Sequence, residues 1–341
     1  MRLHGMIYLE IIGSLILTSC AASLHSAHSV AVDSADHVQN ASLPSPETAE
    51  AHVQRGMALG DQGNLDGAIE ELNEAIRLSP QDVEAHATLG LALEKKGEWD
   101  QAIAEYERAI EAKPNHAGAH AGLGVALHKK GDFNRAIMEY RTALRLDPAA
   151  LNTHYNLALA LHANGEHQAA IAEYDTVIRL NPQYAPAHYN LGIALWQQGD
   201  IDGTIMEMGI ALGMEPYLID AHYYLGLALE AKHDLDGASA EYESVTKLRP
   251  GDPSAYLRLG HILEQKGQVS DAVDTYGRAR DIAPDAAEVH AALGLALKTT
   301  GEYSAARTEL EEALRLLPEE PSHQDRRLQL RQALQAVGSK G

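Results

Sequence analysis

The stretch Val83–His116, VEAHATLGLALEKKGEWDQAIAEYERAIEAKPNH, is the unit from which most of this chain is built. A step of thirty-four residues from Pro114 in either direction reaches another proline each time, and the same step relates a series of leucines from Leu59 to Leu297. The prolines are Pro80, Pro114, Pro148, Pro182, Pro216, Pro250, Pro284 and Pro318. A fixed period of this length, without insertions, predicts a solenoid of stacked units.

Each unit is predicted to be a pair of helices. Apolar residues recur three and four apart, which is the period of an amphipathic helix. In the quoted unit, Gly97 interrupts the pattern and Glu98 follows it, which is typical of one helix ending and another beginning. Pro114 then ends the second helix. A single hairpin of this kind cannot bury its apolar faces alone, so neighbouring hairpins must stack.

The residues that carry the period resemble the tetratricopeptide repeat (TPR), whose pattern sets a large residue, Leu-Gly, an aromatic, alanine, an aromatic and proline at fixed offsets. The corresponding places in the quoted unit hold His86, Leu89, Gly90, Leu93, Ala102, Tyr106 and Pro114. Seven units depart from the family pattern with histidine at the first place, and all eight have leucine at the first aromatic place. The resemblance implies an all-α fold, a right-handed α-solenoid superhelix of eight helical hairpins.

The predicted hairpins are contiguous and are followed by a cap. Their boundaries are 49–82, 83–116, 117–150, 151–184, 185–218, 219–252, 253–286 and 287–320. Residues 321–341 form the capping helix and tail, with Ser322–Val337 predicted to be the helix that covers the last apolar face. Because Gly209 and Gly213 weaken one helix and His233 replaces a turn glycine, we expect the greatest looseness at residues 203–236.

The first twenty residues are predicted to be a signal peptide. The apolar run Ile11–Leu17 is too short for a bilayer, which needs roughly 20 apolar residues. It leads into Leu17-Thr18-Ser19-Cys20, which resembles the lipobox of bacterial lipoproteins. The resemblance implies cleavage before Cys20 and attachment of lipid, including palmitate, to that cysteine. A plain signal peptide cleaved nearby is the alternative. Residues 21–48, rich in Ala, Ser and His, are predicted to be a disordered tether.

Composition narrows the classes of partner. The formal net charge is −21, from 27 Lys and Arg against 48 Asp and Glu. Such a chain repels phosphate backbones, so nucleic acid is not expected as a partner, and basic proteins are favoured. Cys20 is the only cysteine, which excludes a disulfide within the chain.

A series of histidines recurs with the repeat: His52, His86, His120, His154, His188, His222 and His290. Equivalent residues of stacked hairpins are about 8–10 Å apart, so one metal ion cannot bridge them. We expect these rings to pack where the family pattern places tryptophan, with a pH effect as the alternative. His116 and His120, four apart, are the other pair that a metal could use, but they lack a third ligand.

No catalytic constellation is present. The sequence has no HExxH, GxxxxGK[ST] or GxSxG motif, and the glycine-rich stretch Ala117–Gly124 follows a helix, which argues against a phosphate loop. We therefore expect a protein that is not an enzyme and uses no cofactor or metal.

The resemblance implies a concave groove lined by the first helix of each hairpin. A row of aromatic and amide residues falls at the expected places: Tyr155, Asn156, Tyr189, Asn190, Trp196, Tyr223 and Tyr224. Rings supply contact area and amides bond a peptide backbone, so this row is a candidate peptide-binding site. The alternative is that these residues are ordinary repeat filler.

The expected function is a protein-binding scaffold of the bacterial cell envelope. The lipid on Cys20 would anchor the chain to a membrane, expected to be the periplasmic face of the outer membrane, and the groove would bind a protein or peptide partner. Two alternatives stay open: a soluble exported adaptor in the periplasm or outside the cell, and an accessory subunit of an enzyme complex.

Overall fold

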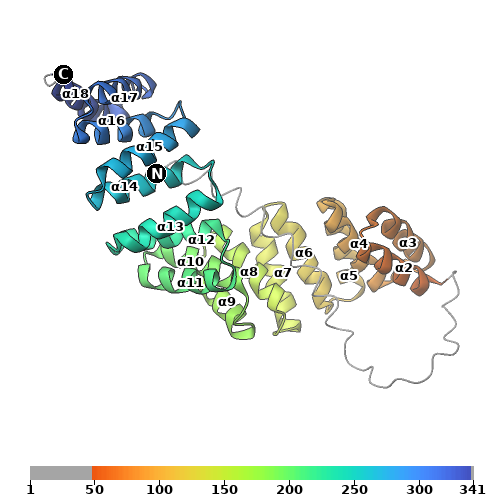
Figure 1. Cartoon of the computed structure of the whole chain (residues 1–341). Coiled ribbons are helices and arrows are strands. Elements are labelled where there is room, and N and C mark those ends of the chain that lie inside the picture. The colour runs from red at the N-terminus through yellow and green to blue at the C-terminus, as the bar shows by residue number, and fades with distance from the viewer. Residues whose placement is uncertain (1–47, 339–341) are drawn as a thin grey trace. The chain divides into compact units, whose positions relative to one another are not determined.

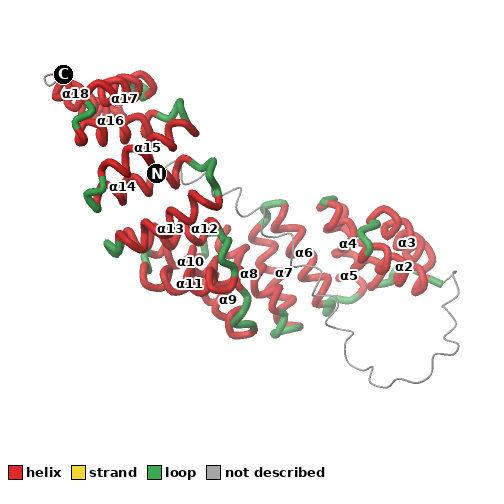
Figure 2. The backbone as a smooth tube through the Cα atoms, in the orientation of Figure 1, coloured by secondary structure: helices red, strands yellow, loops and turns green. Residues whose placement is uncertain are grey.

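The computed structural model describes residues 48–338, and in that range the chain forms seventeen α-helices, one short 3-10 helix and no strand (Figure 2). The all-helical solenoid predicted from the repeat is confirmed. The predicted signal peptide, the tether up to Glu47 and the last three residues lie outside the described residues. None of the helices in residues 48–338 has the length and apolar character that crossing a bilayer requires.

Two helices occupy each thirty-four-residue unit, in the order labelled in Figure 1. The first helices are α2 (Ala49–Asp61), α4 (Val83–Lys96), α6 (Ala117–Lys129), α8 (Leu151–Ala163), α10 (Ala185–Gln198), α12 (Ile219–Ala231), α14 (Pro253–Gln265) and α16 (Ala287–Thr300). The second helices are α3 (Leu65–Leu78), α5 (Trp99–Ala112), α7 (Phe133–Leu146), α9 (His167–Leu180), α11 (Ile201–Met214), α13 (Leu235–Leu248), α15 (Val269–Ile282) and α17 (Tyr303–Leu316).

The chain divides into two compact units, one ending at Ala187 and one beginning at His188, within α10. In the first unit, each helix from α2 to α9 packs against the next one along the chain. The second unit repeats this arrangement from α11 to α18. The right-handed twist of the array stays a prediction.

The turns inside the hairpins need a left-handed backbone. Gly97 ends α4 with φ +81°, a conformation that glycine adopts without steric cost. His233 occupies the same place after α12 with φ +60°, the one positive φ of a non-glycine residue in the described range. The strained turn predicted there is confirmed, and the greater looseness of residues 203–236 stays a prediction.

Glycine on the first helix lets the second helix approach closely. A Cβ built on Gly124 would lie 2.6 Å from the ring of Tyr140, and one on Gly90 would lie 2.8 Å from Tyr106. Both rings are buried, so they have little room to retreat. The glycine of the Leu-Gly pair therefore leaves room for the aromatic ring of the partner helix, which a side chain at that position would displace.

Each histidine of the series bonds the glutamate nineteen residues later, on the second helix of the same hairpin. The histidine Nδ1 lies 2.5–2.7 Å from the glutamate Oε2 in all seven cases. The pairs are His52–Glu71, His86–Glu105, His120–Glu139, His154–Glu173, His188–Glu207, His222–Glu241 and His290–Glu309. We call this series the His–Glu ladder.

The second ring nitrogen of the ladder histidines reaches the preceding turn. In five pairs the Nε2 lies 2.8–3.1 Å from the carbonyl of the proline six residues earlier. A carbonyl and an ionised carboxylate are both acceptors, so both contacts are hydrogen bonds only when both ring nitrogens carry a proton. At His154, whose pKa is raised by the hydrogen bond to Glu173, this geometry favours an imidazolium facing a carboxylate.

The seventh hairpin shows that the two partners of the ladder change together. Tyr256 stands at the histidine place, and Thr275 stands at the glutamate place nineteen residues later. A glutamate left there alone would be a carboxylate without the hydrogen bond of its histidine near the helix interface, which costs free energy. The histidine and the glutamate are therefore replaced in the same hairpin, as expected if each residue is there because of the other.

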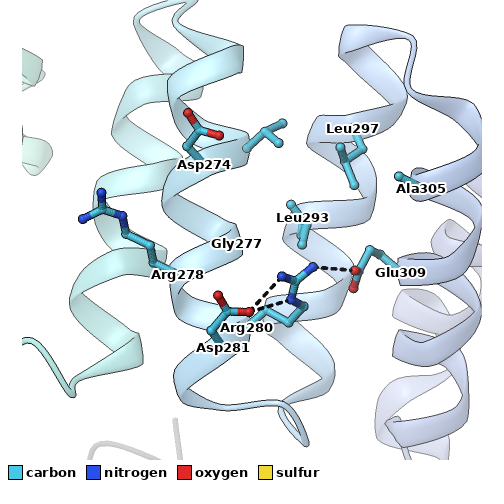
Figure 3. Close-up of a pocket in the computed structure, with 10 residues that line it drawn as sticks. Asp274, Gly277, Arg278, Arg280, Asp281, Leu293, Leu297, Ala305 and Glu309 are labelled. Atoms are coloured by element: carbon cyan, nitrogen blue, oxygen red, sulfur yellow. Dashed lines mark hydrogen bonds and ion pairs between the residues drawn. The ribbon is translucent and has the colours of Figure 1, made fainter.

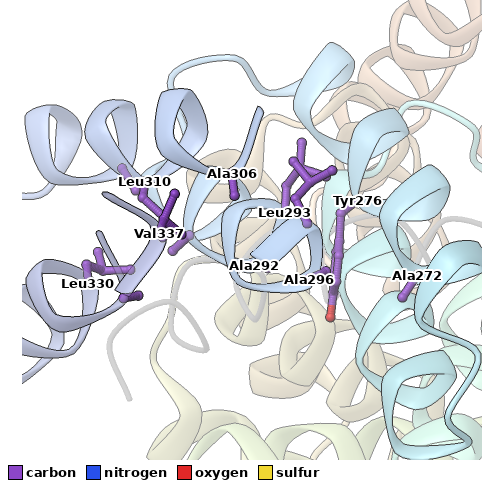
Figure 4. Packing of buried hydrophobic residues seen from close by; sticks show 13 residues of the cluster. Ala272, Tyr276, Ala292, Leu293, Ala296, Ala306, Leu310, Leu330 and Val337 are labelled. Carbon is purple, nitrogen blue, oxygen red and sulfur yellow. The ribbon is translucent and has the colours of Figure 1, made fainter. Parts of the chain in front are cut away.

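A capping helix ends the second unit. After the 3-10 turn η3 (Pro321–His323), α18 (Gln324–Gly338) packs against α16 and α17. Leu330, Ala333 and Val337 of α18 are buried in the cluster that includes Tyr276 and Leu310, whereas Leu328 is exposed. Figure 4 shows Leu330 and Val337 of α18 in this cluster. The predicted helix is thus present and begins at Gln324.

We predict opposite effects for two glycine substitutions. Gly124→Ala should destabilise the protein by roughly 1–3 kcal/mol, because the new methyl collides with the buried Tyr140 ring. Gly209→Ala, on the open side of α11, should stabilise it by roughly 1 kcal/mol, because nothing lies within 4 Å of the new Cβ and alanine favours helix. Urea unfolding of both variants at low protein concentration tests this, and equal effects would contradict the close approach.

We predict that the His154–Glu173 pair makes stability depend on pH. The hydrogen bond to Glu173 raises the pKa of His154 above its ordinary 6.5, although burial and Arg179 oppose the shift and the Pro148 carbonyl supports it. Since the folded pKa is the higher one, the stabilisation is complete below pH 6.5 and is lost as the pH rises through the raised value.

The measurement is the urea midpoint of the native chain and of His154→Gln from pH 5.5 to 8.5. The difference between them should shrink as the pH rises. His261→Gln is the control, because the His261 ring packs on the edge of Tyr276 and has no carboxylate hydrogen-bonded to it in the described structure. A difference that stays constant over this range for His154→Gln would contradict the prediction.

Candidate protein-binding site

Two of the tyrosines predicted to line a groove are buried. Tyr155 and Tyr189 each expose 3% of their surface, and Asn156 exposes 9%. The Tyr155 ring packs against those of Tyr174 and Tyr184, with centroids 6.2 and 5.2 Å apart. Rings so enclosed support the helices and offer a partner almost no area. For these three residues the structure favours the alternative of repeat filler, and a role in binding would need them to move.

The other four residues of the row are half-buried and lie in the second unit. Asn190 and Trp196 are on α10, and Tyr223 and Tyr224 are on α12. The Tyr223 ring packs 5.9 Å from that of Tyr242 and meets the Tyr224 ring edge to face at 6.3 Å. These packed rings are held in place while part of their surface stays open to a partner.

A charged pair lies beside the two tyrosines of α12. Arg258 of α14 is 3.6 Å from Glu230 of α12 and also contacts Tyr223. Burial works against the charge of Arg258, but Tyr223 and Glu230 favour it, and the pKa of its guanidinium is raised. The guanidinium therefore stays charged at physiological pH.

The phenol of Tyr224 stays neutral. Burial, followed by the nearby Asp220 and Tyr223, raises the pKa of Tyr224. We call Tyr223, Tyr224, Glu230 and Arg258 the α12 surface. Chemically it combines aromatic area, hydroxyl groups and a guanidinium that can donate to a peptide carbonyl or a carboxylate.

The buried tyrosines of the second helices use a set of glutamates that sequence reasoning missed. The hydroxyls of Tyr106, Tyr242 and Tyr276 donate to Glu94, Glu230 and Glu264, at 3.0, 2.9 and 2.7 Å. In each case the glutamate stands twelve residues before the tyrosine. Burial and the glutamate together raise the pKa of Tyr242 and of Tyr276. The fixed spacing is the sequence signal that could have identified this pair.

The third hairpin has His128 in place of that glutamate. Burial, with a smaller effect from Lys129, lowers the pKa of His128 to about 4. The His128 ring packs on the edge of Phe133, with centroids 5.3 Å apart. His128 is thus neutral at physiological pH, and it belongs to the packing of the hairpin.

The described residues hold no metal-binding group. No set of three or more His, Cys, Asp or Glu side chains in residues 48–338 is placed to share an ion. His116 and His120, the pair considered for a metal, bond to other groups. His116 accepts from the Ala119 amide at the start of α6, and His120 bonds Glu139 and the Pro114 carbonyl. The stretch Ala117–Gly124 is the first part of α6, so it forms no phosphate loop.

A pocket of about 320 Å³ lies between α15, α16 and α17. Its lining combines apolar residues, Val273, Leu293 and Leu297 among them, with charged ones. Figure 3 shows Arg280 reaching Asp281 on one side and Glu309 on the other, at 2.8 and 3.1 Å. Because Glu309 is also the ladder partner of His290, this arginine serves the packing of the hairpins.

Comparisons with known proteins agree with the repeat. Family profiles described as TPR repeat match residues 56–97 and 160–199, and profiles described as tetratricopeptide repeat match residues 87–150, 228–296 and 287–319. No functionally curated protein matches the chain.

Several solved structures share the fold. PilF of Pseudomonas aeruginosa is similar at 18% identity, with a TM-score of 0.55 over 64% of this chain and 97% of that one. YrrB, described as a TPR protein with an unusual peptide-binding site, is similar at 21% identity, with a TM-score of 0.50 over 54% and 95%. A tetratricopeptide repeat protein from Parabacteroides merdae is similar at 17% identity, with a TM-score of 0.51 over 73% and 98%. With its period, its hairpins and these matches, the chain belongs to the tetratricopeptide repeat family.

Proposed function

We propose that this protein is a non-enzymatic scaffold that binds a protein or peptide partner at the bacterial cell envelope. TPR repeat proteins are commonly scaffolds for protein–protein interaction. The observation that carries the proposal for this chain is the α12 surface, where two half-buried tyrosines lie beside a charged arginine. Half-buried aromatic residues and arginine are enriched where proteins bind each other.

The fixed geometry of this surface supports recognition of an extended peptide. Tyr223 is held by Tyr242, and Arg258 is held by Glu230, so ordering them on binding loses little conformational entropy. The rings can cover apolar side chains of a partner while Arg258 donates to its carbonyl oxygens. Trp196 and Asn190 of α10 extend the same row of repeat positions and add aromatic area and an amide.

The envelope location rests on the sequence around Cys20. The apolar run followed by Leu-Thr-Ser-Cys has the form of a lipobox, and Cys20 is the single cysteine of the chain. A lipidated Cys20 would anchor the repeats at a membrane through residues 21–48, with the outer membrane as the proposed site. The helices of residues 48–338 would then act as the part that binds partners.

Substitution of two half-buried aromatic residues of the row should weaken partner capture. We predict that Trp196→Ala combined with Tyr224→Ala weakens binding at least tenfold, or about 1.4 kcal/mol, because both contribute contact area. Affinity capture from intact envelopes, followed by titration of the main captured protein, measures this.

Trp99→Ala is the matched control for the loss of a tryptophan, since Trp99 begins the second helix α5 and lies outside the row. It should leave capture unchanged. Equal capture by the native chain and the double variant would contradict the proposed surface.

Labelling with palmitate tests the anchor separately. Cells that express the native chain should yield labelled protein in the membrane fraction, and Cys20→Ala should lose the label and leave that fraction. A labelled Cys20→Ala protein, or an unlabelled native protein in the soluble fraction, would contradict the lipid anchor and support an exported soluble adaptor.

A further inference from the structure

The exposed side of α11 has a chemistry unlike that of the other second helices. We define the α11 outer face as Met206, Gly209, Ile210, Gly213 and, directly after the helix, Tyr217. The first four are spaced three and four apart, so they share one side of the helix. Met206, Ile210 and Tyr217 are 58%, 37% and 80% exposed. The α11 outer face therefore presents large apolar groups to solvent. The helix itself is labelled in Figure 1.

The α11 outer face carries no charge, whereas the four equivalent helical positions of every other second helix include at least two charged residues. Those charged residues are Glu70, Glu74 and Arg77; Glu107, Arg108 and Glu111; Arg141 and Arg145; Asp175 and Arg179; Glu243 and Lys247; Asp274, Arg278 and Asp281; Glu311, Glu312 and Arg315. A chain with a net charge of −21 thus leaves one outer face neutral.

The packing of the hairpin does not explain the two glycines of this face. Glycine inside a helix costs about 1 kcal/mol relative to alanine. A Cβ on Gly209 or Gly213 would have nothing within 4 Å, whereas one on Gly192 would lie 2.8 Å from Met208. Gly192 is needed for the close approach of α11 to α10, but Gly209 and Gly213 have no such role among the described residues.

We propose that the α11 outer face is a self-association surface, on which a second copy of the chain packs its own α11 outer face across a twofold axis. Two acidic chains repel each other wherever their charged faces meet. At α11 they can approach without bringing carboxylates together. A twofold interface needs the same patch to complement itself. Here Gly209 and Gly213 form a flat strip where two helix backbones can come close, and Met206 and Ile210 flank it.

The small size of the face predicts a weak, reversible dimer. From Met206 to Gly213 the helix is about 10 Å long, so together with Tyr217 each copy buries on the order of a few hundred Å². Stable interfaces bury about 800 Å² per partner. We therefore expect a dissociation constant on the order of 100 µM.

Sedimentation equilibrium over about 10–500 µM, a range that brackets the expected constant, tests the proposal. The native chain should pass from monomer to dimer. Met206→Glu should keep it monomeric, because each added carboxylate would be buried in an apolar interface without a cation to pair with. The matched control is Met138→Glu, a methionine at the same place of the third hairpin with 63% exposure, which should dimerise as the native chain does.

The double variant Gly209→Ala with Gly213→Ala separates association from folding. It should unfold at higher urea concentration than the native chain, yet dimerise at least tenfold more weakly, because two methyl groups hold the helices apart. A native chain that is monomeric throughout, or a dimer that Met206→Glu leaves intact, would overturn the proposal. The proposal would also be overturned if the native chain stayed monomeric and bound phosphatidylcholine vesicles, and if Met206→Glu abolished that binding. That result would assign the face to a membrane.

Discussion

The hydrogen-bonded pair of a first-helix histidine and a second-helix glutamate joins the two helices in seven of the eight hairpins, and the seventh hairpin has Tyr256 and Thr275 in its place. One imidazole joins three segments: its own helix, the partner helix through the carboxylate, and the preceding turn through the proline carbonyl. Both bonds are best made by an imidazolium, so the contact is at once a packing element and a charge pair. In all seven pairs the glutamate Oε2 lies 2.5–2.7 Å from the histidine Nδ1.

Two further contacts set the spacing of the helices. A glycine such as Gly124 accepts the ring of the partner helix, which brings the two backbones together. Between hairpins, a lysine at the end of a first helix pairs with an aspartate of the previous second helix, as Lys96 does with Asp66 and Lys266 with Asp236. These exposed pairs contribute little free energy, but they repeat at a constant spacing. Helices of thirteen or fourteen residues are marginal alone, so such contacts are what keeps them folded.

Much of this arrangement was predictable from the period, and the failures have a physical cause. The prolines and turn glycines located the helices within a few residues, and the place of His233 indicated a left-handed turn. Helical periodicity identifies a face but not the depth of each residue, which is why Tyr155 and Tyr189 were expected to be accessible although both are buried. The histidines were expected to pack at the place of the family's tryptophan, with a pH effect as the alternative. Their glutamates were missed because the nineteen-residue spacing crosses two helices and has no counterpart in the 3.6-residue period; the joint change to Tyr256 and Thr275 was the signal available.

The most direct test of the ladder is the protonation state of one of its rings. Nitrogen-15 NMR of the His154 imidazole, assigned by comparison with a His154→Gln spectrum, reports whether each ring nitrogen carries a proton. At pH 6.5, the ordinary midpoint of histidine, both nitrogens should be protonated in more than half of the molecules, because the pKa of His154 is raised. A ring that is mostly neutral at that pH, with Nδ1 or Nε2 unprotonated, would contradict the account.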